Sequence, residues 1–313
     1  MSGDTSQTVL VCDPVDPLLL EGLRAKGLDV RYRPDISRQE LLAVVGEYAI
    51  LVVRSRTKVS REVIEAGSKL RLVARAGIGT DNIDLAAASA RGIEIVTAAG
   101  SSTQSVAELN VGLAIIMARN LLNLSNGVRD GEWKKLIGSE LFNKTAGIIG
   151  YGRIGHYTAR ILHSMGLRIL AYDVVKDTRR IAEVDGTYVS LDMLLKDSDI
   201  IFLLASFSQD SNAMLGSHHL NQMKESAFIV NTSRAEFING PELLNALETH
   251  RISGYAADVT WNEPPSEDWE KRIISMKNVI ITPHIGAQTI EAQRRVAEFT
   301  LRNLLEKMEA MGL

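Results

Sequence analysis

Cysteine is almost absent from this sequence of 313 residues, in which Cys12 is the single one. An intramolecular disulfide is therefore impossible, and a metal site built from clustered thiolates is excluded. Long apolar runs are missing as well, because none approaches the ~20 residues that a membrane-spanning helix needs. The N-terminal segment MSGDTSQT has neither the basic nor the apolar part of a signal peptide. We therefore expect a cytoplasmic protein that has no membrane partner and binds no metal.

An excess of charge of one sign is also missing. The formal net charge is −3, which gives no reason to expect binding to nucleic acid or to an acidic membrane surface. Hydrophobic residues make up 45% of the chain and charged residues 23%, which is ordinary for a globular enzyme. The length is enough for about two domains at the usual ~100–200 residues each.

Short apolar runs alternate with helix-like segments over most of the chain, which predicts parallel sheets covered on both faces. In the first region the runs are VLVC (9–12), AILVV (49–53), LRLVA (70–74) and IEIV (93–96). A longer helical pattern from about Ser102 to Asn126 separates this region from a second one. There the alternation resumes from Thr145 to Ile285 with six expected strands, as in a complete dinucleotide-binding domain. A helical pattern from Ala287 to about Met308 closes the chain.

The stretch from Thr145 to Asp173 has the form of a dinucleotide-binding βαβ unit. Gly150 allows a tight turn, and Gly152 lets the backbone approach a pyrophosphate. Gly155 lets the helix lie against the strand, with its N-terminus directed at the anion. Asp173 is placed to accept hydrogen bonds from the adenosine ribose, where its charge would repel a 2′-phosphate. The stretch therefore predicts NAD binding in preference to NADP.

Three polar residues follow later strands of the same region: Arg234, Glu263 and His284. The carboxyl ends of parallel strands converge on the cofactor crevice. An arginine can hold a carboxylate, a histidine can carry a proton near neutral pH, and a glutamate can orient that histidine. Each residue alone is more often structural or solvated. Together, downstream of a nucleotide motif, they favour hydride transfer between a hydroxyl carbon and nicotinamide.

In order and spacing, the motifs resemble the D-isomer-specific 2-hydroxyacid dehydrogenase family along essentially the whole chain, and most closely its phosphoglycerate dehydrogenases. The resemblance lies in VVRSRTKVS from Val52, RAGIGTDNIDLAAA from Arg75, SVAELNVG from Ser105, DGEW from Asp130, GYGRIG from Gly150, NTSR from Asn231, ADVTWNEPP from Ala257 and PHIGAQTIEAQ from Pro283.

The resemblance implies roles for individual residues. It implies that Arg234 binds substrate, that His284 is the acid/base, and that Glu263 is its carboxylate partner. The cofactor contacts that it implies, beyond the glycine turn and Asp173, are Arg153, Ile154, Thr232, Ser233, Asp258 and Gly286. It also implies that backbone around Gly77 and Ile78 receives the substrate carboxylate, with Arg54, Ser55 and Arg75 nearby.

The same resemblance implies an α/β fold of two doubly wound parallel-sheet domains. A Rossmann NAD-binding domain, residues 102–286, would be inserted in a flavodoxin-like substrate domain made of residues 1–101 and 287–313. Substrate would bind in a cleft whose closure excludes water. It further implies a homodimer, built mainly through the nucleotide domain and the helix from Ser102.

The chain departs from the family pattern at several points. Leu204–Ser206 replaces a run that includes an adenine contact, and Ala235–Phe237 replaces small residues that usually follow the arginine. The run Gly100–Thr103 lacks a usual asparagine. Only Lys134 and Lys135 remain of a basic segment that phosphoglycerate enzymes use for the phosphate. Because the chain closes at Leu313, serine feedback through C-terminal regulatory domains is not expected.

These observations favour an NAD-dependent enzyme that oxidises 3-phosphoglycerate to 3-phosphohydroxypyruvate, a reaction of serine biosynthesis. The basic residues Arg54, Arg75, Lys134 and Lys135 suit a phosphate but could equally be solvated surface. Reduction of hydroxypyruvate or glyoxylate, or another 2-hydroxy acid, therefore stays open. A non-catalytic NAD-sensing protein of the corepressor kind is disfavoured, because all three catalytic candidates are present.

Overall fold

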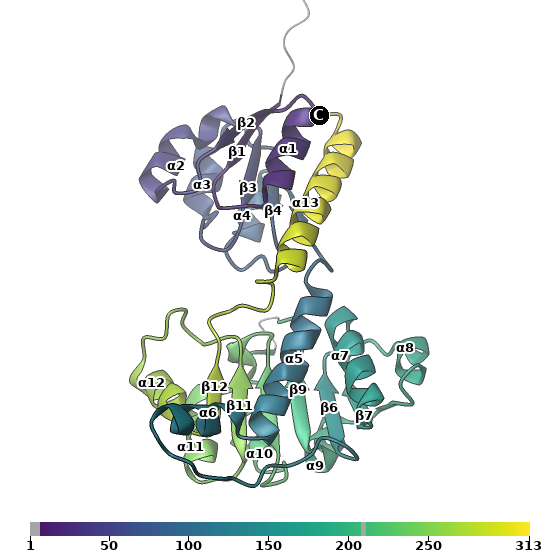
Figure 1. Cartoon of the computed structure of the whole chain (residues 1–313). Coiled ribbons are helices and arrows are strands. Elements are labelled where there is room, and N and C mark those ends of the chain that lie inside the picture. Colours follow the sequence, from purple (N-terminus) through teal and green to yellow (C-terminus); the bar gives the residue numbers. More distant parts are fainter. Residues whose placement is uncertain (1–6, 208–210) are drawn as a thin grey trace, which may run out of the picture. The chain divides into compact units, whose positions relative to one another are not determined.

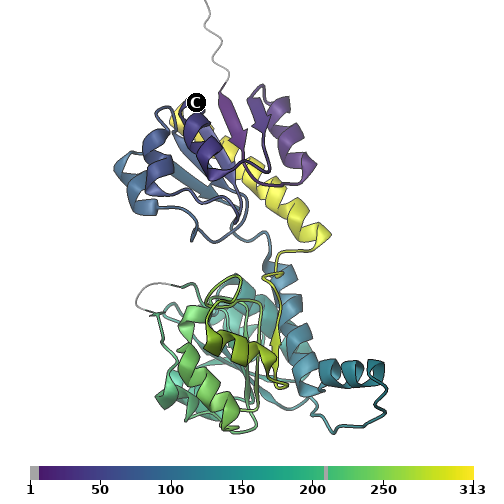
Figure 2. The same cartoon turned by 90° about the vertical axis from the view of Figure 1, so that its left-hand side faces the viewer.

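The computed structural model describes residues 7–207 and 211–313, and the chain divides into two compact units (Figures 1 and 2). Unit 1 comprises Met1–Ser102 and Gln288–Leu313, and unit 2 comprises Thr103–Ala287. Unit 2 is thus inserted in the sequence of unit 1.

Unit 1 contains a parallel sheet in the order β2-β1-β3-β4-β5, which is the flavodoxin-like order. Its strands are β1 (Thr8–Val11), β2 (Asp29–Tyr32), β3 (Ile50–Val53), β4 (Leu72–Arg75) and β5 (Glu94–Thr97). The helices are α1 (Pro17–Ala25), α2 (Arg38–Val44), the 3-10 helix η1 (Val45–Glu47), α3 (Arg61–Ala66), α4 (Leu85–Ala90) and α13 (Ile290–Met311).

Alternate side chains of these strands enter two separate cores, because successive residues of a strand point to opposite faces. On one face Val9, Val11 and Ile50 pack with residues of α1 and α13, which lie side by side in Figure 1. On the other face Leu10 and Leu51 pack with residues of α2, α3 and α4. The sheet is therefore covered on both sides, as the runs of apolar residues predict.

Unit 2 contains a parallel sheet in the order β12-β11-β10-β9-β6-β7-β8, a Rossmann order with one additional strand. Its strands are β6 (Thr145–Ile149), β7 (Arg168–Tyr172), β8 (Thr187–Tyr188), β9 (Ile200–Leu203), β10 (Phe228–Asn231), β11 (Gly254–Ala257) and β12 (Val279–Ile281). The helices are α5 (Thr103–Ala118), α6 (Leu121–Arg129), α7 (Arg153–Ser164), α8 (Thr178–Ala182), α9 (Leu191–Asp197), α10 (Ser217–Leu220), the 3-10 helix η3 (Ala235–Phe237), α11 (Gly240–Glu248) and α12 (Asp268–Ser275). The expected fold class of two parallel α/β domains is confirmed.

Two expectations about the elements of unit 2 were wrong. The single helix expected from Ser102 to Asn126 is broken into α5 and α6, which are bent by 65°. At the break Asn120 has a left-handed φ of 51°, a conformation that asparagine tolerates better than most residues. The second sheet has seven strands rather than six, because the two-residue edge strand β8 has no apolar run. Among the described residues no single helix is long and apolar enough to span a membrane, and α5 and α6 meet those criteria only as a bent pair.

Candidate active site

The glycine turn between β6 and α7 shows a different need for each glycine. Gly150 has φ 92°, and a Cβ there would lie 2.2 Å from the backbone nitrogen of Ala205. A Cβ on Gly155 would lie 2.2 Å from the carbonyl oxygen of Gly150. Gly152, at the N-terminus of α7, differs because a Cβ there would meet only open space on the described chain. Gly150 and Gly155 are thus needed for close packing, whereas Gly152 leaves room for a ligand.

Asp173 follows β7 and lies beside this turn. Its carboxylate accepts hydrogen bonds from the backbone nitrogens of Tyr151, at 2.6 Å, and Val175, at 2.9 Å. The turn follows the carboxyl end of β6, whose neighbour in the sheet is β9. Between these two strands the strand order reverses, and α/β sheets bind their ligands at such a point. An open helix N-terminus for a pyrophosphate and a carboxylate for a ribose therefore occur together, and these residues fit a dinucleotide.

The two departures near the nucleotide motif, Leu204–Ser206 and Ala235–Phe237, lie in segments that contact each other. Ser233 donates its hydroxyl hydrogen to the carbonyl oxygen of Ala205. The rings of Phe207 and Phe237 meet edge to face, with 5.4 Å between their centroids. The two segments therefore pack against each other.

Arg234, Glu263 and His284 follow β10, β11 and β12, which are neighbours in the sheet of unit 2. His284 Nδ1 lies 3.0 Å from each carboxylate oxygen of Glu263. This contact leaves Nε2 as the ring nitrogen that can exchange a proton with a substrate. Buried Asn231 ties the Arg234 turn, because its Nδ2 donates to the carbonyl oxygen of Arg234 at 3.0 Å.

The three residues also influence one another electrostatically. The hydrogen bond that His284 donates to the Glu263 carboxylate raises the pKa of His284, although partial burial of the ring acts in the opposite direction. The same hydrogen bond lowers the pKa of the Glu263 carboxyl, and the positive charge of Arg234 lowers it further. Arg234 lowers the pKa of His284 as well, so its charge acts on both partners. The side chains of His284 and Glu263 are 52% and 46% exposed, which leaves them accessible to a substrate.

Asp258, at the end of β11, organises the turn that carries His284. Its carboxylate accepts hydrogen bonds from Thr282 Oγ1 at 2.6 Å and from the backbone nitrogens of Ile285 and Gly286, both at 2.7 Å. The side chain is almost fully buried, and His284 adopts a left-handed φ of 53° in this turn. In the structure these oxygens of Asp258 are engaged by donors of its own chain.

Thr232 is linked through Asn110 of α5 to Thr158 of α7, the helix that follows the glycine turn. Its hydroxyl donates to Asn110 Oδ1 at 2.8 Å, and Asn110 Nδ2 donates to Thr158 Oγ1 at 3.1 Å. Asn110 and Thr158 are fully buried. Sequence reasoning missed Asn110, although a polar residue within the apolar pattern of a helix was a usable signal.

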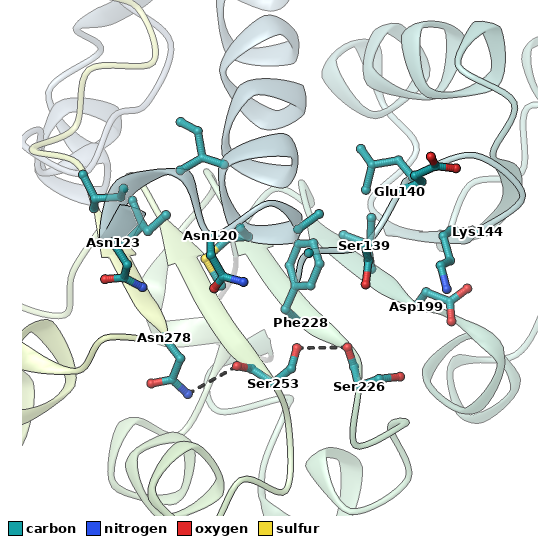
Figure 3. Close-up of a pocket in the computed structure, with 18 of the residues that line it drawn as sticks. Asn120, Asn123, Ser139, Glu140, Lys144, Asp199, Ser226, Phe228, Ser253 and Asn278 are labelled. Carbon is teal, nitrogen blue, oxygen red and sulfur yellow. Dashed lines mark hydrogen bonds between the residues drawn. The ribbon is translucent and has the colours of Figure 1, made fainter. Parts of the chain in front are cut away.

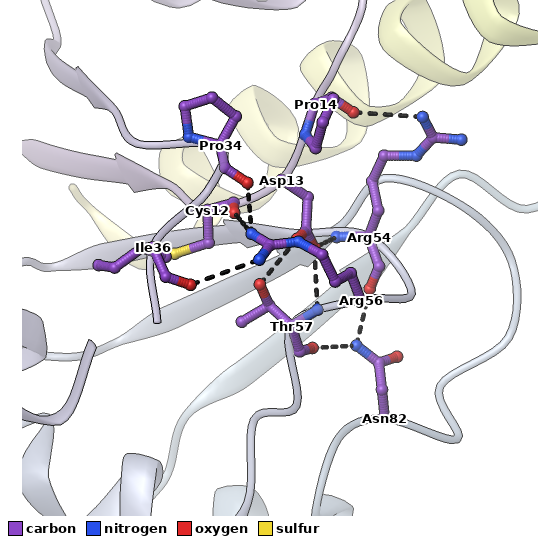
Figure 4. Close-up of polar contacts among 9 residues, drawn as sticks. All are labelled: Cys12, Asp13, Pro14, Pro34, Ile36, Arg54, Arg56, Thr57 and Asn82. Carbon is purple, nitrogen blue, oxygen red and sulfur yellow. Dashed lines mark hydrogen bonds and ion pairs between the residues drawn. The ribbon is translucent and has the colours of Figure 1, made fainter. Parts of the chain in front are cut away.

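In unit 1, the expected substrate residues Arg54 and Ser55 lie in a turn that is anchored by Asp13 (Figure 4). Buried Asp13 accepts hydrogen bonds from Arg54 N, from Thr57 N at 3.3 Å and from Thr57 Oγ1 at 2.7 Å. Arg56 Nε donates to the same carboxylate at 3.0 Å, and its Nη2 donates to the carbonyl oxygen of Cys12 at 2.6 Å. The guanidinium of Arg56 therefore stabilises the turn through hydrogen bonds within unit 1.

Asn82 joins this turn to the chain that follows β4. Its Nδ2 donates to the carbonyl oxygens of Arg54, at 2.7 Å, and Thr57, at 2.6 Å. In the segment between β4 and Asn82, a Cβ on Gly77 would lie 1.4 Å from Nη1 of Arg75, so the guanidinium covers this glycine. Ile78, the next residue, is exposed. All five expected substrate residues thus lie at or just after the carboxyl ends of β3 and β4 in unit 1.

Lys134 and Lys135 lie on the exposed segment 130–140, which joins α6 to β6 and therefore leads to the amino ends of the strands. At that edge of the sheet a cavity of about 290 Å³ is lined by Asn120, Ser139, Phe228 and Asn278, among others (Figure 3). None of the expected catalytic or cofactor residues lines it. The cavity is thus separate from the candidate site, which lies at the carboxyl ends.

Comparison with known proteins identifies the family. The profile of the D-isomer specific 2-hydroxyacid dehydrogenase NAD-binding domain matches residues 111–286. The chain belongs to the D-isomer-specific 2-hydroxyacid dehydrogenase family. Its NAD-binding domain lies within unit 2, which contains the glycine turn, Arg234, Glu263 and His284.

Similar proteins differ in the substrate that their names give. The chain is 35% identical to D-3-phosphoglycerate dehydrogenase of Archaeoglobus fulgidus over 97% of its own length and 58% of the relative. It is 38% identical to hydroxypyruvate reductase of Thermotoga maritima over 92% of its length and 94% of the relative. The structure of D-lactate dehydrogenase from Aquifex aeolicus, complexed with NAD and lactic acid, superposes with a TM-score of 0.85 at 26% identity and covers 98% of this chain and 96% of that one. The chain thus spans little more than half of the phosphoglycerate dehydrogenase and nearly all of the reductase.

Proposed function

We propose that this chain transfers a hydride between C2 of a 2-hydroxy acid and NAD. The observation that carries the proposal is the 3.0 Å contact between His284 Nδ1 and Glu263, at the sheet edge that also holds Arg234. His284 Nε2 takes the hydroxyl proton as the hydride leaves, and Glu263 stabilises the resulting imidazolium. Arg234 holds the substrate carboxylate or polarises the keto oxygen. NAD, when bound, supplies the hydride acceptor.

The remaining site residues follow from the same proposal. The helix N-terminus at Gly152 receives the pyrophosphate, and Asp173 receives the ribose hydroxyls. The other cofactor residues are Gly150, Arg153, Ile154, Gly155, Thr232, Ser233, Asp258 and Gly286. The substrate residues in unit 1 are Arg54, Ser55, Arg75, Gly77 and Ile78.

The leading substrate is 3-phosphoglycerate, oxidised to 3-phosphohydroxypyruvate. Its support is the 35% identity to a D-3-phosphoglycerate dehydrogenase and the two arginines, Arg54 and Arg75, at the carboxyl ends of β3 and β4 in unit 1. Reduction of hydroxypyruvate or glyoxylate is the second candidate. One support is the match to a hydroxypyruvate reductase over 94% of that protein. Another is the position of Lys134 and Lys135: they lie on the segment that leads to the amino ends of the strands, away from the candidate site, and so do not supply charge for a substrate phosphate there.

A substrate panel separates these candidates. NADH formation is measured with 3-phosphoglycerate, glycerate and lactate, and NADH consumption with 3-phosphohydroxypyruvate, hydroxypyruvate and glyoxylate. We expect the highest kcat/KM with 3-phosphoglycerate or its keto acid. Activity confined to the unphosphorylated acids would replace the leading substrate by the second candidate. Absence of turnover on every acid, with NAD still bound, would refute the proposed reaction.

The same proposal includes a homodimer formed through unit 2. Every residue of the amphipathic helix α6 is exposed or half-buried, and Leu121 and Val128 are 43% and 50% exposed. In the following segment Trp133 is 86% exposed and Ile137 is fully exposed. Several exposed apolar side chains on one helix and the segment after it are typical of a protein–protein contact, and a second copy of the chain would cover them.

Light scattering during size-exclusion chromatography tests this assembly. We expect the mass of a dimer for the unmodified chain and the mass of a monomer for Ile137→Asp. Val175→Asp, which changes another exposed apolar residue elsewhere in unit 2, is the control and should remain dimeric. A monomeric unmodified chain would refute the dimer.

A further inference from the structure

A buried carboxylate lies next to the loop that carries Glu263. It belongs to Glu270, in the first turn of α12, whose residue is only 1% exposed. Oε1 accepts a hydrogen bond from Asn262 N at 2.8 Å. Oε2 accepts three, from Asn262 Nδ2, Ser266 N and Glu267 N, all at 3.0 Å. A carboxylate withdrawn from water is stable only with such compensation.

Helix capping explains only part of this arrangement. Glu270 and Glu267 form a capping box, in which the Glu270 side chain accepts from Glu267 N and the Glu267 side chain accepts from Glu270 N. A capping box needs no further donor. The other three hydrogen bonds come from Asn262 and Ser266, which flank Glu263 on its two sides.

We propose that Glu270 is a positioning residue for proton transfer: by fixing both ends of the turn 262–266, it holds Glu263 against His284. The segment between the fixed ends contains Pro264 and Pro265, whose rings restrict the backbone. Two fixed ends and a stiff interior leave the Glu263 carboxylate little freedom. This inference rests on the proposed roles of Glu263 and His284.

The consequence concerns the charge of His284. The charged groups that act on its ring are Glu263, Asp258 and Arg234. Glu263 and Asp258 favour the imidazolium, and Arg234 opposes it. If the 262–266 turn loosens, the strongest favourable contact is lost while Arg234 remains. His284 then gives up its proton at lower pH, although Glu270 does not touch it.

Glu270→Gln tests the proposal. The carboxylate of Glu270 accepts hydrogen bonds on both oxygens, but an amide has only one acceptor oxygen. In Glu270→Gln the NH2 group would therefore meet either Asn262 N or the three donors that now bond to the other oxygen, so that donor faces donor. The His284 midpoint is followed by NMR titration of the imidazole protons, assigned by their loss in His284→Asn. We expect Glu270→Gln to move this midpoint to lower pH, in the same direction as Glu263→Gln. The double variant should match Glu263→Gln alone, because the effect of Glu270 passes through Glu263.

Glu267→Gln is the matched control, since it weakens the same capping box without touching Asn262 or Ser266. It should lower the melting temperature and leave the His284 midpoint in place. Asn262→Ala is a second variant in case Glu270→Gln does not fold, and it should move the midpoint in the same direction. An unmoved midpoint in both Glu270→Gln and Asn262→Ala, or additive shifts in the double variant, would overturn the proposal. Because the titration needs no turnover, a chain inactive on every 2-hydroxy acid would refute the proposed function and leave this test intact.

Discussion

Alanine at Gly150 should lower the stability of unit 2, whereas alanine at Gly152 should lower the affinity for NADH. At Gly150 a Cβ would lie 2.2 Å from the nitrogen and 2.3 Å from the Cα of Ala205, in a backbone with φ 92°. The left-handed conformation costs an alanine about 1–2 kcal/mol, and the overlap with fixed backbone adds about 1–3 kcal/mol. Gly150→Ala should therefore lower the free energy of unfolding of unit 2 by roughly 2–5 kcal/mol.

At Gly152 the same methyl group meets open space, and φ is an ordinary −76°. The only penalty to folding is the exchange of glycine for alanine at the start of α7, which is about 1 kcal/mol or less. In the proposed complex, however, the methyl group stands where the pyrophosphate approaches. An overlap of about 1–3 kcal/mol corresponds to an NADH affinity reduced about 5-fold to 150-fold.

Tryptophan fluorescence reads the stability of unit 2 directly, because Trp133, Trp261 and Trp269 are the only tryptophans of the chain and all belong to it. Urea unfolding followed by this signal should show a clearly lower midpoint for Gly150→Ala and a nearly unchanged one for Gly152→Ala. NADH titration should show the loss of affinity in Gly152→Ala. Equal destabilisation by the two substitutions, or unchanged NADH binding in Gly152→Ala, would refute the distinction drawn between the two glycines.

Three further predictions concern charge in the site. Glu263→Gln should move the rising limb of the pH–rate profile for hydroxy-acid oxidation to lower pH, because it removes the group that raises the pKa of His284; a lower rate at an unmoved midpoint would argue against this tuning. Asp173→Ser should reduce the preference for NAD over NADP about 12-fold to 150-fold, the effect of about 1.5–3 kcal/mol from one charged hydrogen bond, and the ratio of kcat/KM values measures it. Asp258→Asn should lower kcat about 10-fold to 100-fold by loosening the turn that carries His284, and wild-type turnover with normal circular dichroism would count against that role.

The elements with buried apolar runs could be predicted from the sequence. VLVC predicts β1 to within a residue, because both faces of a central parallel strand are covered and its residues are all apolar. The edge strand β2, with the sequence DVRY and mostly exposed side chains, has no such run and was missed. The break at Asn120 was also hidden, because the apolar pattern continues across it while only the backbone conformation changes.

The sequence could predict which polar residues at strand ends form the candidate site. It could not predict the residues that hold them in place. Arg234, Glu263 and His284 follow strands that are neighbours in the sheet, so parallel topology predicts that they meet. Asp13 and Arg54 are 41 positions apart in the chain, and nothing local connects them. Glu270 reads as an ordinary acid in the first turn of a helix, because burial of its carboxylate depends on how the loop before it folds.

The position of α13 in the sequence has a consequence for folding during synthesis. The ribosome completes all of unit 2 before it releases α13, so unit 1 stays incomplete while its neighbour in the sequence can already fold. During that interval Val9, Val11 and Ile50, which later pack in the core that α13 closes, lack part of their cover. The nascent chain therefore carries a partly uncovered apolar sheet face for the time needed to translate unit 2. A chaperone that binds apolar surfaces would protect this face until the last helix emerges.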